Sequence, residues 1–229
     1  MKHSGKARKA AFKIIVYSFV AGCVIWGVMW VGFWIGAILS TIALPALMVL
    51  WVVFTVFTVY FFRDPSPRVP MGANLVLSPG HGKVDVIDTT TEALFMGGEC
   101  QRVSVFLSVF DVHVQNAPVS GRVALFKYTE GQFLNAMRTE SAVHNENVLL
   151  GFEAREPQGQ RVGVRLIAGV IARRIVPFVQ EGDEVARGDR ISLIQFGSRA
   201  DVYLPASAKI RVQTGDHVVG GETVLAVFE

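Results

Sequence analysis

The chain has 229 residues, a net charge of +3 and 51% hydrophobic residues. Its length is enough for one soluble domain of ordinary size and a further segment. The charge is too small to indicate a nucleic-acid-binding protein, and no aromatic and basic binding module is apparent. Cys23 and Cys100 form no metal-ligand spacing, so we expect no metal site and a reduced cytoplasmic domain.

The further segment is an apolar run from Ile14 to Phe62 that contains no charged side chain. One bilayer span needs about 20 apolar residues, so this run is long enough for two helices. We expect the two helices to be joined near residues 36–41 or slightly later, with Pro45 in the first turn of the second helix, where proline is tolerated. A buried soluble hairpin is a poorer alternative because no polar face interrupts the run, and a signal peptide has a much shorter apolar region.

Basic residues flank the apolar run on both sides, while the loop inside it carries no charge. The positive-inside rule therefore places both ends in the cytoplasm, and the basic flanks suit anionic lipid headgroups. The sequence predicts a protein of the cell (inner, cytoplasmic) membrane with three parts. They are a basic cytoplasmic N-terminus (residues 1–13), two transmembrane helices (14–62) and a domain that faces the cytoplasm (63–229).

Beyond the proline-rich segment 63–70, short apolar runs alternate with Gly, Pro, Asp and Asn turns, which is typical of a mainly β domain. Two patterns each occur twice in it. Pro-x-x-Gly-basic-Val occupies residues 79–84 and 118–123, and Gly-Asp-x-Val with a later Gly-acid pair occupies 182–191 and 215–224. Coincidentally similar hairpin turns are the alternative, but two different repeats in one chain argue against coincidence. Such paired hairpins look like the flattened barrel of biotinyl and lipoyl carrier domains, a barrel-sandwich hybrid.

The bond between Gly197 and Ser198 lies between two strand-like runs. Glycine permits unusual backbone geometry, and the serine hydroxyl can attack the carbonyl that precedes it. If the resulting ester eliminates, the chain is cut and Ser198 becomes a pyruvoyl group. Taken alone, the dipeptide is more typical of a turn.

From about Tyr60 to the C-terminus, segments in chain order resemble the phosphatidylserine decarboxylase family in its short bacterial and archaeal form. Each is modest alone, but the ordered set is specific. The segments are 60–65, 104–121, 131–136, 167–175 and 196–199. The resemblance implies a proenzyme that cuts itself between Gly197 and Ser198 without hydrolysis, into residues 1–197 and 198–229.

The resemblance also implies the chemistry. A covalent pyruvoyl cofactor derived from Ser198, with no metal, would take the amine of phosphatidylserine as a Schiff base and accept electrons as carbon dioxide leaves, giving phosphatidylethanolamine. No pyridoxal lysine motif is evident. The expected partners are a phospholipid substrate, the membrane, the two cleaved chains and a second copy in a homodimer, with no nucleic acid.

The family match suggests roles for several side chains. His113 is expected to transfer protons, since imidazole titrates near neutral pH. The alternative is that His113 is an ordinary residue on the polar face of a strand. Arg173 and Arg174 suit the phosphate or carboxylate of the substrate, or form a solvated basic turn. Asn135 and Asn116 are expected headgroup contacts, although Asn135 equally fits a turn.

Residue 81 departs from the family pattern. The first turn usually reads Ser-Pro-Ala-Asp-Gly, and its aspartate is implicated in self-cleavage, whereas this chain has His81 there. His81 is therefore a candidate base that activates Ser198, or else it marks a slower or inactive cleavage site. Asp201 and Tyr203 share one strand face, which either lines the pocket or faces solvent.

Three alternatives remain open. The first keeps the chemistry with a related lipid such as archaetidylserine, because the headgroup is shared. The second is a membrane-anchored carrier or adaptor, but a carrier needs a lysine at a hairpin tip, and the tips at residues 183–190 and 216–222 contain none. The third is a processing-defective relative, which His81 suggests.

Overall fold

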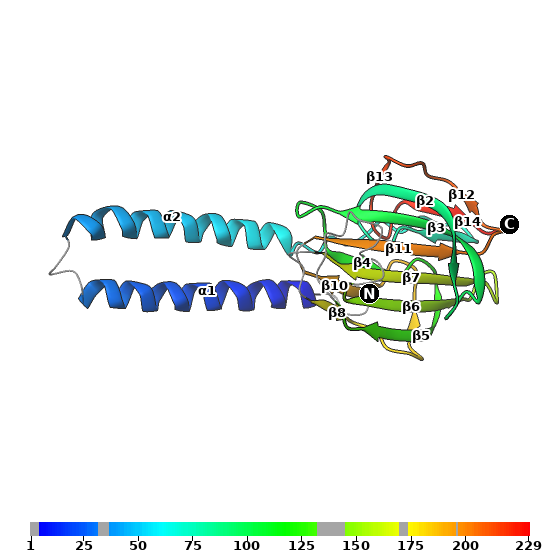
Figure 1. Cartoon of the computed structure of the whole chain (residues 1–229), viewed down its shortest axis with the longest axis horizontal. Coiled ribbons are helices and arrows are strands. Elements are labelled where there is room, and N and C mark those ends of the chain that lie inside the picture. Colours follow the sequence, from blue (N-terminus) through cyan, green and yellow to red (C-terminus); the bar gives the residue numbers. More distant parts are fainter. Residues whose placement is uncertain (1–4, 32–36, 132–144, 170–173, 196) are drawn as a thin grey trace. The chain divides into compact units, whose positions relative to one another are not determined.

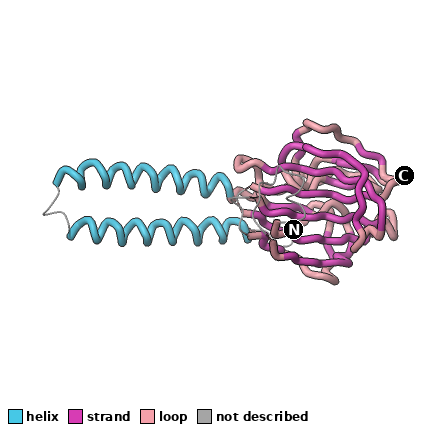
Figure 2. The backbone as a smooth tube through the Cα atoms, viewed as in Figure 1, coloured by secondary structure: helices cyan, strands magenta, loops and turns pink. Residues whose placement is uncertain are grey.

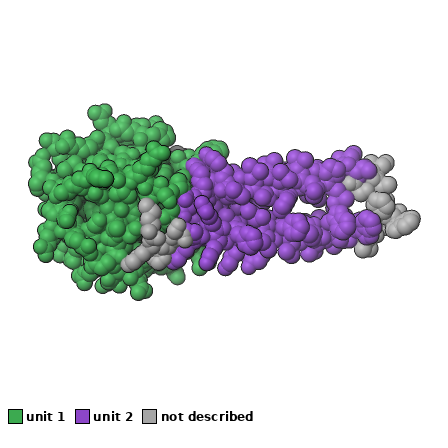
Figure 3. Space-filling view, turned by 180° about the vertical axis from the view of Figure 1, so that it is seen from behind, with its two compact units in different colours: residues 1–4, 65–229 green, residues 5–64 purple. Residues whose placement is uncertain are grey.

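The computed structural model describes residues 5–31, 37–131, 145–169, 174–195 and 197–229. The chain divides into two compact units, a helical one that comprises residues 5–64 and a β-rich one that comprises residues 65–229 (Figure 3).

Two apolar helices, α1 (Lys6–Val31) and α2 (Ala37–Phe61), form the first unit (Figure 1). Within them, Lys6–Trp30 and Thr41–Phe61 are long and apolar enough to cross a membrane. Large apolar side chains cover their surfaces rather than a single stripe, which suits surroundings of lipid. α1 begins before the predicted start at Ile14, because the preceding Lys, Arg and Ala residues are good helix formers.

The prediction for Pro45 was wrong. α2 starts at Ala37, inside the segment expected to be the connection, so Pro45 lies within the helix rather than in its first turn. Proline removes one backbone hydrogen bond, a cost that an apolar helix in a membrane tolerates when neighbouring groups adjust. The uninterrupted apolar sequence on both sides of Pro45 explains why the helix continues through it.

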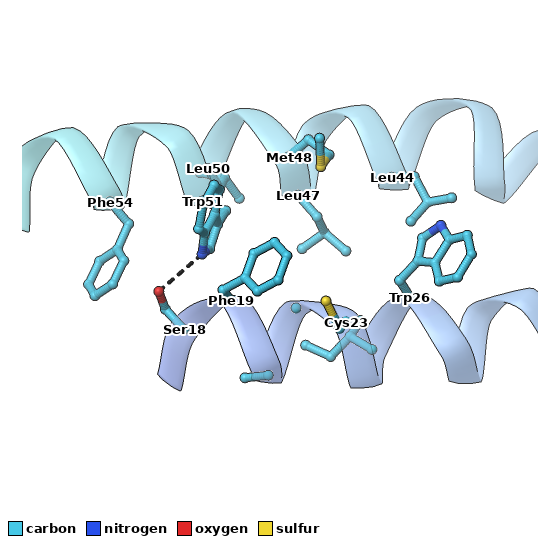
Figure 4. Close-up of a pocket in the computed structure, with 13 residues that line it drawn as sticks. Ser18, Phe19, Cys23, Trp26, Leu44, Leu47, Met48, Leu50, Trp51 and Phe54 are labelled. Carbon is cyan, nitrogen blue, oxygen red and sulfur yellow. Dashed lines mark hydrogen bonds between the residues drawn. The ribbon is translucent and has the colours of Figure 1, made fainter. Parts of the chain in front are cut away.

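The facing sides of the two helices contact one another through aromatic and small polar side chains. Trp51 Nε1 donates a hydrogen bond of 3.0 Å to Ser18 Oγ, and the Phe19 and Trp51 rings lie 5.6 Å apart (Figure 4). Between the helices lies a groove of about 570 Å³ with an almost wholly apolar lining, which includes Trp26 and Met48.

The described residues of the second unit form fourteen strands, which confirms the mainly β prediction. An eight-stranded antiparallel sheet, in the order β13-β2-β3-β11-β7-β6-β5-β9, curls over two three-stranded sheets, β1-β14-β12 and β4-β10-β8 (Figure 2). The strands are β1 (Leu75–Leu77), β2 (Gly82–Glu92), β3 (Gly98–Leu107), β4 (Val114–Asn116), β5 (Gly121–Thr129), β6 (Asn147–Ala154), β7 (Arg161–Ala168), β8 (Ile175–Pro177), β9 (Glu184–Val185), β10 (Arg190–Ile194), β11 (Ser198–Leu204), β12 (Lys209–Ile210), β13 (His217–Val218) and β14 (Val224–Val227).

The two repeated sequence patterns are also repeated in three dimensions. Val84 N–H donates to Asp216 O and Gly215 N–H to Val84 O, at 2.9 and 2.8 Å. The second copy repeats this exchange between Val123 and residues 182–183, at 2.8 and 2.7 Å. The pairs β2–β13 and β5–β9 therefore lie at the two edges of the large sheet as equivalent units, which supports the predicted barrel-sandwich fold.

The glycine of each first pattern is required by a close backbone approach. A methyl group on Gly82 would lie 2.1 Å from Phe106 O, and one on Gly121 would lie 2.0 Å from Glu153 O. Only glycine permits strands to approach this closely. The repeated glycine thus allows the close backbone contacts at the starts of β2 and β5.

Strand β11 lies in the interior of the large sheet, between β3 and β7. Its alternate residues Ala200, Val202 and Leu204 point into the main hydrophobic core, which the two smaller sheets complete. Ser198, at the start of β11, shares this core-facing side because it is separated from Ala200 by two positions.

Candidate active site

Gly197 and Ser198 lie where the chain leaves β10 and enters β11. Gly197 has φ +74°, a conformation that glycine adopts readily and other residues rarely do. Ser198 is fully buried between Leu107 of β3 and Ala168 of β7. Its Oγ has no hydrogen-bond partner within the described part of the chain. A buried hydroxyl without a partner is costly and uncommon, so this atom is a candidate for a chemical role.

His113, which precedes β4, directs its imidazole at the backbone N–H of Gly197. The backbone N–H of Gly197 donates a hydrogen bond of 3.0 Å to Nε2 of His113. An amide N–H can only donate, so Nε2 carries a lone pair, and Nδ1 therefore carries the proton that it donates to Asp111 O, 2.9 Å away. His113 is thus a neutral, fully buried imidazole with its basic nitrogen beside the Gly197–Ser198 bond.

Buried hydrogen bonds hold the backbone of His113 in place. Its carbonyl oxygen accepts from Ile194 N–H at 3.0 Å and from Gln115 Nε2 at 2.7 Å. Gln115 Oε1 in turn accepts from Ser192 Oγ at 2.6 Å. Both Gln115 and Ser192 are fully buried, so β10 fixes the position of the histidine segment.

The carbonyl group of Gly197 has its own donor. The backbone N–H of Gly169, just after β7, donates to Gly197 O at 3.1 Å. This is the carbonyl that the Ser198 hydroxyl would attack, and a fixed N–H at its oxygen can stabilise negative charge there. The Gly197–Ser198 bond is therefore flanked by a base, a hydroxyl and a carbonyl donor.

Two buried residues that the sequence analysis missed hold the segment around Gly169. Asn145 Nδ2 donates to Ala168 O at 2.7 Å, and the carboxylate of Glu146 accepts from Ile175 N–H at 3.1 Å. Glu146 also accepts from Ala168 N–H through its backbone oxygen. The sequence signal for them was a run of polar residues directly before the apolar strand β6.

His81 occupies the turn position that Ser120 holds in the second copy of the repeat. Ser120 Oγ accepts a hydrogen bond of 2.9 Å from the backbone N–H of Arg187. The counterpart of Arg187 is Gly220, and a methyl group on Gly220 would lie 3.0 Å from His81 Cδ2 and 3.1 Å from Asn116 Oδ1. The imidazole of His81 therefore lies against Gly220, as does the side chain of Asn116, and it makes no hydrogen bond to Ser198 Oγ.

Of the remaining predicted residues, the structure describes Asn116 and Arg174. Asn116 is buried, and its Nδ2 donates to Gly188 O at 2.8 Å. Arg174 is exposed, directly before β8. Arg173 and Asn135 lie outside the described residues.

Asp201 and Tyr203 lie on the face of β11 opposite Ser198. The alternation of the strand places both with Arg199 rather than with the serine. Burial raises the pKa of the Tyr203 hydroxyl well above its usual value, with the nearby Asp201 carboxylate adding to the effect. Among the residues that the structure describes, no cluster of His, Cys, Asp and Glu could hold a metal ion.

Comparison with known proteins identifies the family to which this arrangement belongs. A family model described as phosphatidylserine decarboxylase matches residues 54–226, which include the whole candidate site. The chain belongs to the phosphatidylserine decarboxylase family. Its members are carboxy-lyases of phospholipid metabolism, so the enzyme class predicted from the sequence is confirmed.

Three relatives carry the name phosphatidylserine decarboxylase proenzyme. The one from Gluconobacter oxydans is 47% identical over 171 residues, which is 73% of this chain and 75% of the relative. Those from Desulfotalea psychrophila and Rickettsia bellii are each 41% identical, over 167 and 173 residues. They cover 73% and 74% of this chain, and 77% and 74% of their own lengths.

Proposed function

We propose that this chain is a proenzyme that cuts itself between Gly197 and Ser198 and then decarboxylates phosphatidylserine to phosphatidylethanolamine. The observation that carries the proposal is the hydrogen bond from Gly197 N–H to His113 Nε2, which places a basic nitrogen next to Gly197. The neighbouring Ser198 hydroxyl is buried and has no partner among the described residues. Family membership supplies the reaction class, and the relatives' name of proenzyme agrees with a cut.

Cleavage begins when Ser198 Oγ attacks the carbonyl carbon of Gly197 and His113 Nε2 accepts the hydroxyl proton. The N–H of Gly169 stabilises the negative charge that develops on the Gly197 oxygen. The peptide C–N bond breaks as its nitrogen gains a proton, which leaves an ester to Oγ. Removal of the Ser198 α-proton then breaks the Cβ–Oγ bond, releasing Gly197 as a carboxylate. The dehydroalanine that remains gains water and loses ammonia to become a pyruvoyl group.

Position 198 suits such a group, because it is buried and its side-chain oxygen has no partner among the described residues. A pyruvoyl group supplies an electron sink for the carbanion left when the substrate loses carbon dioxide. His113, fixed through its backbone to β10, holds the proton that the substrate carbon then receives. Strands β3 and β7 keep residue 198 in position on both sides.

Substrate binding is assigned to polar groups near this end of the sheet. Arg174 is exposed and carries a fork of donors for the phosphate or carboxylate of the lipid. Arg173, Asn135 and Asn116 are proposed as further headgroup contacts. The shared headgroup leaves an archaetidylserine-like lipid as an alternative substrate, which a parallel assay of the two lipids distinguishes.

The apolar helices α1 and α2 anchor the enzyme at the membrane that holds its substrate. The basic residues that flank them favour a catalytic domain on the cytoplasmic side of the cell membrane. A homodimer is proposed as the assembled form, and light scattering in detergent measures it.

Mass spectrometry of the purified full-length chain tests the proposal. We expect two fragments, residues 1–197 and 198–229, with the second blocked at its first residue by a keto group that reacts with hydrazines. Incubation with phosphatidylserine in mixed micelles should release carbon dioxide. A purified chain that stays intact, with an unmodified Ser198, contradicts the proposal.

The role of His81 can be tested by replacing it with aspartate, the usual family residue, and with serine, its counterpart in the repeat. Because His113 rather than His81 reaches the cleavage bond, we expect both variants to self-cleave within about threefold of the wild-type rate. Gel electrophoresis over time measures this rate. Cleavage in His81→Asp but none in the wild-type chain would instead identify a processing-defective relative.

A further inference from the structure

Arg199, the residue after Ser198, is one of the largest fully buried side chains of the described chain. Its guanidinium lies on the face of β11 away from the core. Nε donates to Asp201 Oδ1 at 2.8 Å, and Nη1 donates to Asp85 Oδ2 at 3.1 Å. Arg199 and Asp201 are 2% and 0% exposed, so these charges are almost wholly removed from water. Buried charges are costly unless they are paired, which explains why Arg199 has two acidic partners.

The two carboxylates come from different places in the chain. Asp201 is on β11 itself, whereas Asp85 is on β2, with β3 between the two strands. Neighbouring strands are about 4.8 Å apart, so Arg199 reaches about 10 Å across the sheet to Asp85. A cut after Gly197 places Arg199 and Asp201 in one fragment and Asp85 in the other.

The placement of Asp85 is specific to this copy of the repeat. Asp85 lies at a β-bulge between Val84 and Val86, and bulges redirect side chains. The second copy has the same bulge between Val123 and Leu125, where the extra residue is Ala124. The bulge therefore belongs to the fold, while the aspartate is present only in the copy that faces Arg199.

The ionic cluster of Arg199, Asp85 and Asp201 leaves several of its polar atoms without hydrogen bonds, so it is not optimised for stability. Arg199 Nη2, Asp85 Oδ1 and Asp201 Oδ2 are buried and make no hydrogen bond within the described residues. Burial raises the pKa of Asp85 despite the opposing effect of the Arg199 charge. A buried ionic cluster of this kind is weak evidence for stability, whereas it can fix the position of the chain that carries it.

We propose that the ion pair between Arg199 and Asp85 is a clamp that holds the end of the small fragment in register after cleavage. This inference rests on the proposed self-cleavage. Before the cut, residue 198 is tied to the chain on both sides. Afterwards its one covalent link is the peptide bond to Arg199, so the side chain of Arg199 anchors the new terminus to the large fragment through Asp85. Arg199 and Asp85 are thus positioning residues for the reacting group at position 198.

The test compares Asp85→Ala with the matched control Asp88→Ala. Asp88 is on the same strand, its side chain is 40% exposed, and it pairs with Arg102, which lies 3.9 Å from Asp201 and makes no ion pair with Asp85. Removing Asp85, whose side chain is 28% exposed, leaves Arg199 paired with Asp201, so the fold should survive. We expect Asp85→Ala to self-cleave within about threefold of the wild-type rate, while kcat of the cleaved enzyme falls about 10- to 100-fold and KM changes little. Asp88→Ala should retain the wild-type kcat.

Hydrogen exchange separates a clamp from a purely structural contact. In cleaved Asp85→Ala enzyme, the amides of Arg199 and Ala200 should exchange faster than in cleaved wild type. In a Ser198→Ala background, where the chain stays uncut, Asp85→Ala should leave their exchange unchanged. Asp85→Glu, which keeps the charge, should restore part of kcat. If Asp85→Ala does not fold, Arg199→Lys provides the same comparison, because lysine lacks the fork that reaches both carboxylates.

A cleaved Asp85→Ala enzyme with wild-type kcat overturns the clamp, and so does faster exchange that appears equally in the uncut background. A wild-type chain that never cleaves overturns the proposed function and the clamp together. The two failures are therefore distinguishable.

Discussion

With Ser198 replaced by alanine, the chain should remain a single polypeptide of 229 residues and release no detectable carbon dioxide from phosphatidylserine. The substitution removes the hydroxyl that attacks the Gly197 carbonyl and, with it, the source of the electron sink. Both effects follow from one oxygen atom. Ser198 Oγ is buried without a partner, so its removal should leave the free energy of unfolding almost unchanged. Mass spectrometry and a carbon dioxide assay measure the two outcomes.

The matched control is Ser104→Ala. Ser104 is also fully buried, also has an Oγ without a partner in the described structure, and lies on the adjacent strand β3. Ser104 lies across from Asp201, on the face of the sheet opposite Ser198, so its replacement removes the same buried atoms away from the cleavage bond and should leave cleavage and decarboxylation at wild-type rates. Cleavage of the Ser198→Ala chain at Gly197 would show that a contaminating protease makes the cut.

Replacement of His113 by glycine should slow self-cleavage about 10²- to 10⁴-fold, the range for loss of a general base. The reason is the position of Nε2, which accepts a hydrogen bond of 3.0 Å from the N–H of Gly197, the residue whose carbonyl would be attacked. The residual rate should come from the Gly169 donor and the fixed geometry of the turn. Time courses of fragment appearance after cell-free synthesis measure the rate.

Added imidazole should restore part of the cleavage in His113→Gly, because the substitution leaves a cavity of the right shape beside the bond. His217→Gly is the control, since His217 is exposed on β13 and should cleave normally with or without imidazole. Wild-type cleavage by His113→Gly would exclude His113 as the base. It would direct attention to His81 instead.

The architecture was predictable from the sequence because its signals are local or periodic. The apolar run identified the helices, and the repeated patterns identified the equivalent pairs β2–β13 and β5–β9. Pro45 was misplaced because a proline is normally read as a helix start, while a long apolar segment tolerates it inside. Local sequence rules distinguish only weakly between a proline at the start of a helix and a proline inside one.

The contacts of the site were much less predictable because they join distant residues through backbone atoms. The resemblance to the family singled out His113 and Gly197, but their hydrogen bond depends on how β4 pairs with β10. The N–H of Gly169 has no side-chain signature at all. Asp85 was visible only as one aspartate among several, since its role depends on a bulge and on a guanidinium two strands away.

The central position of β11 determines what a cut at Gly197 leaves behind. Residues 198–229 contribute β11 between β3 and β7, β13 beside β2, and β14 beside β1. The two products are thus interleaved in one fold rather than joined at a separable interface. Neither product of such a cut could dissociate without breaking the large sheet, so we expect the cut molecule to unfold as a single cooperative body.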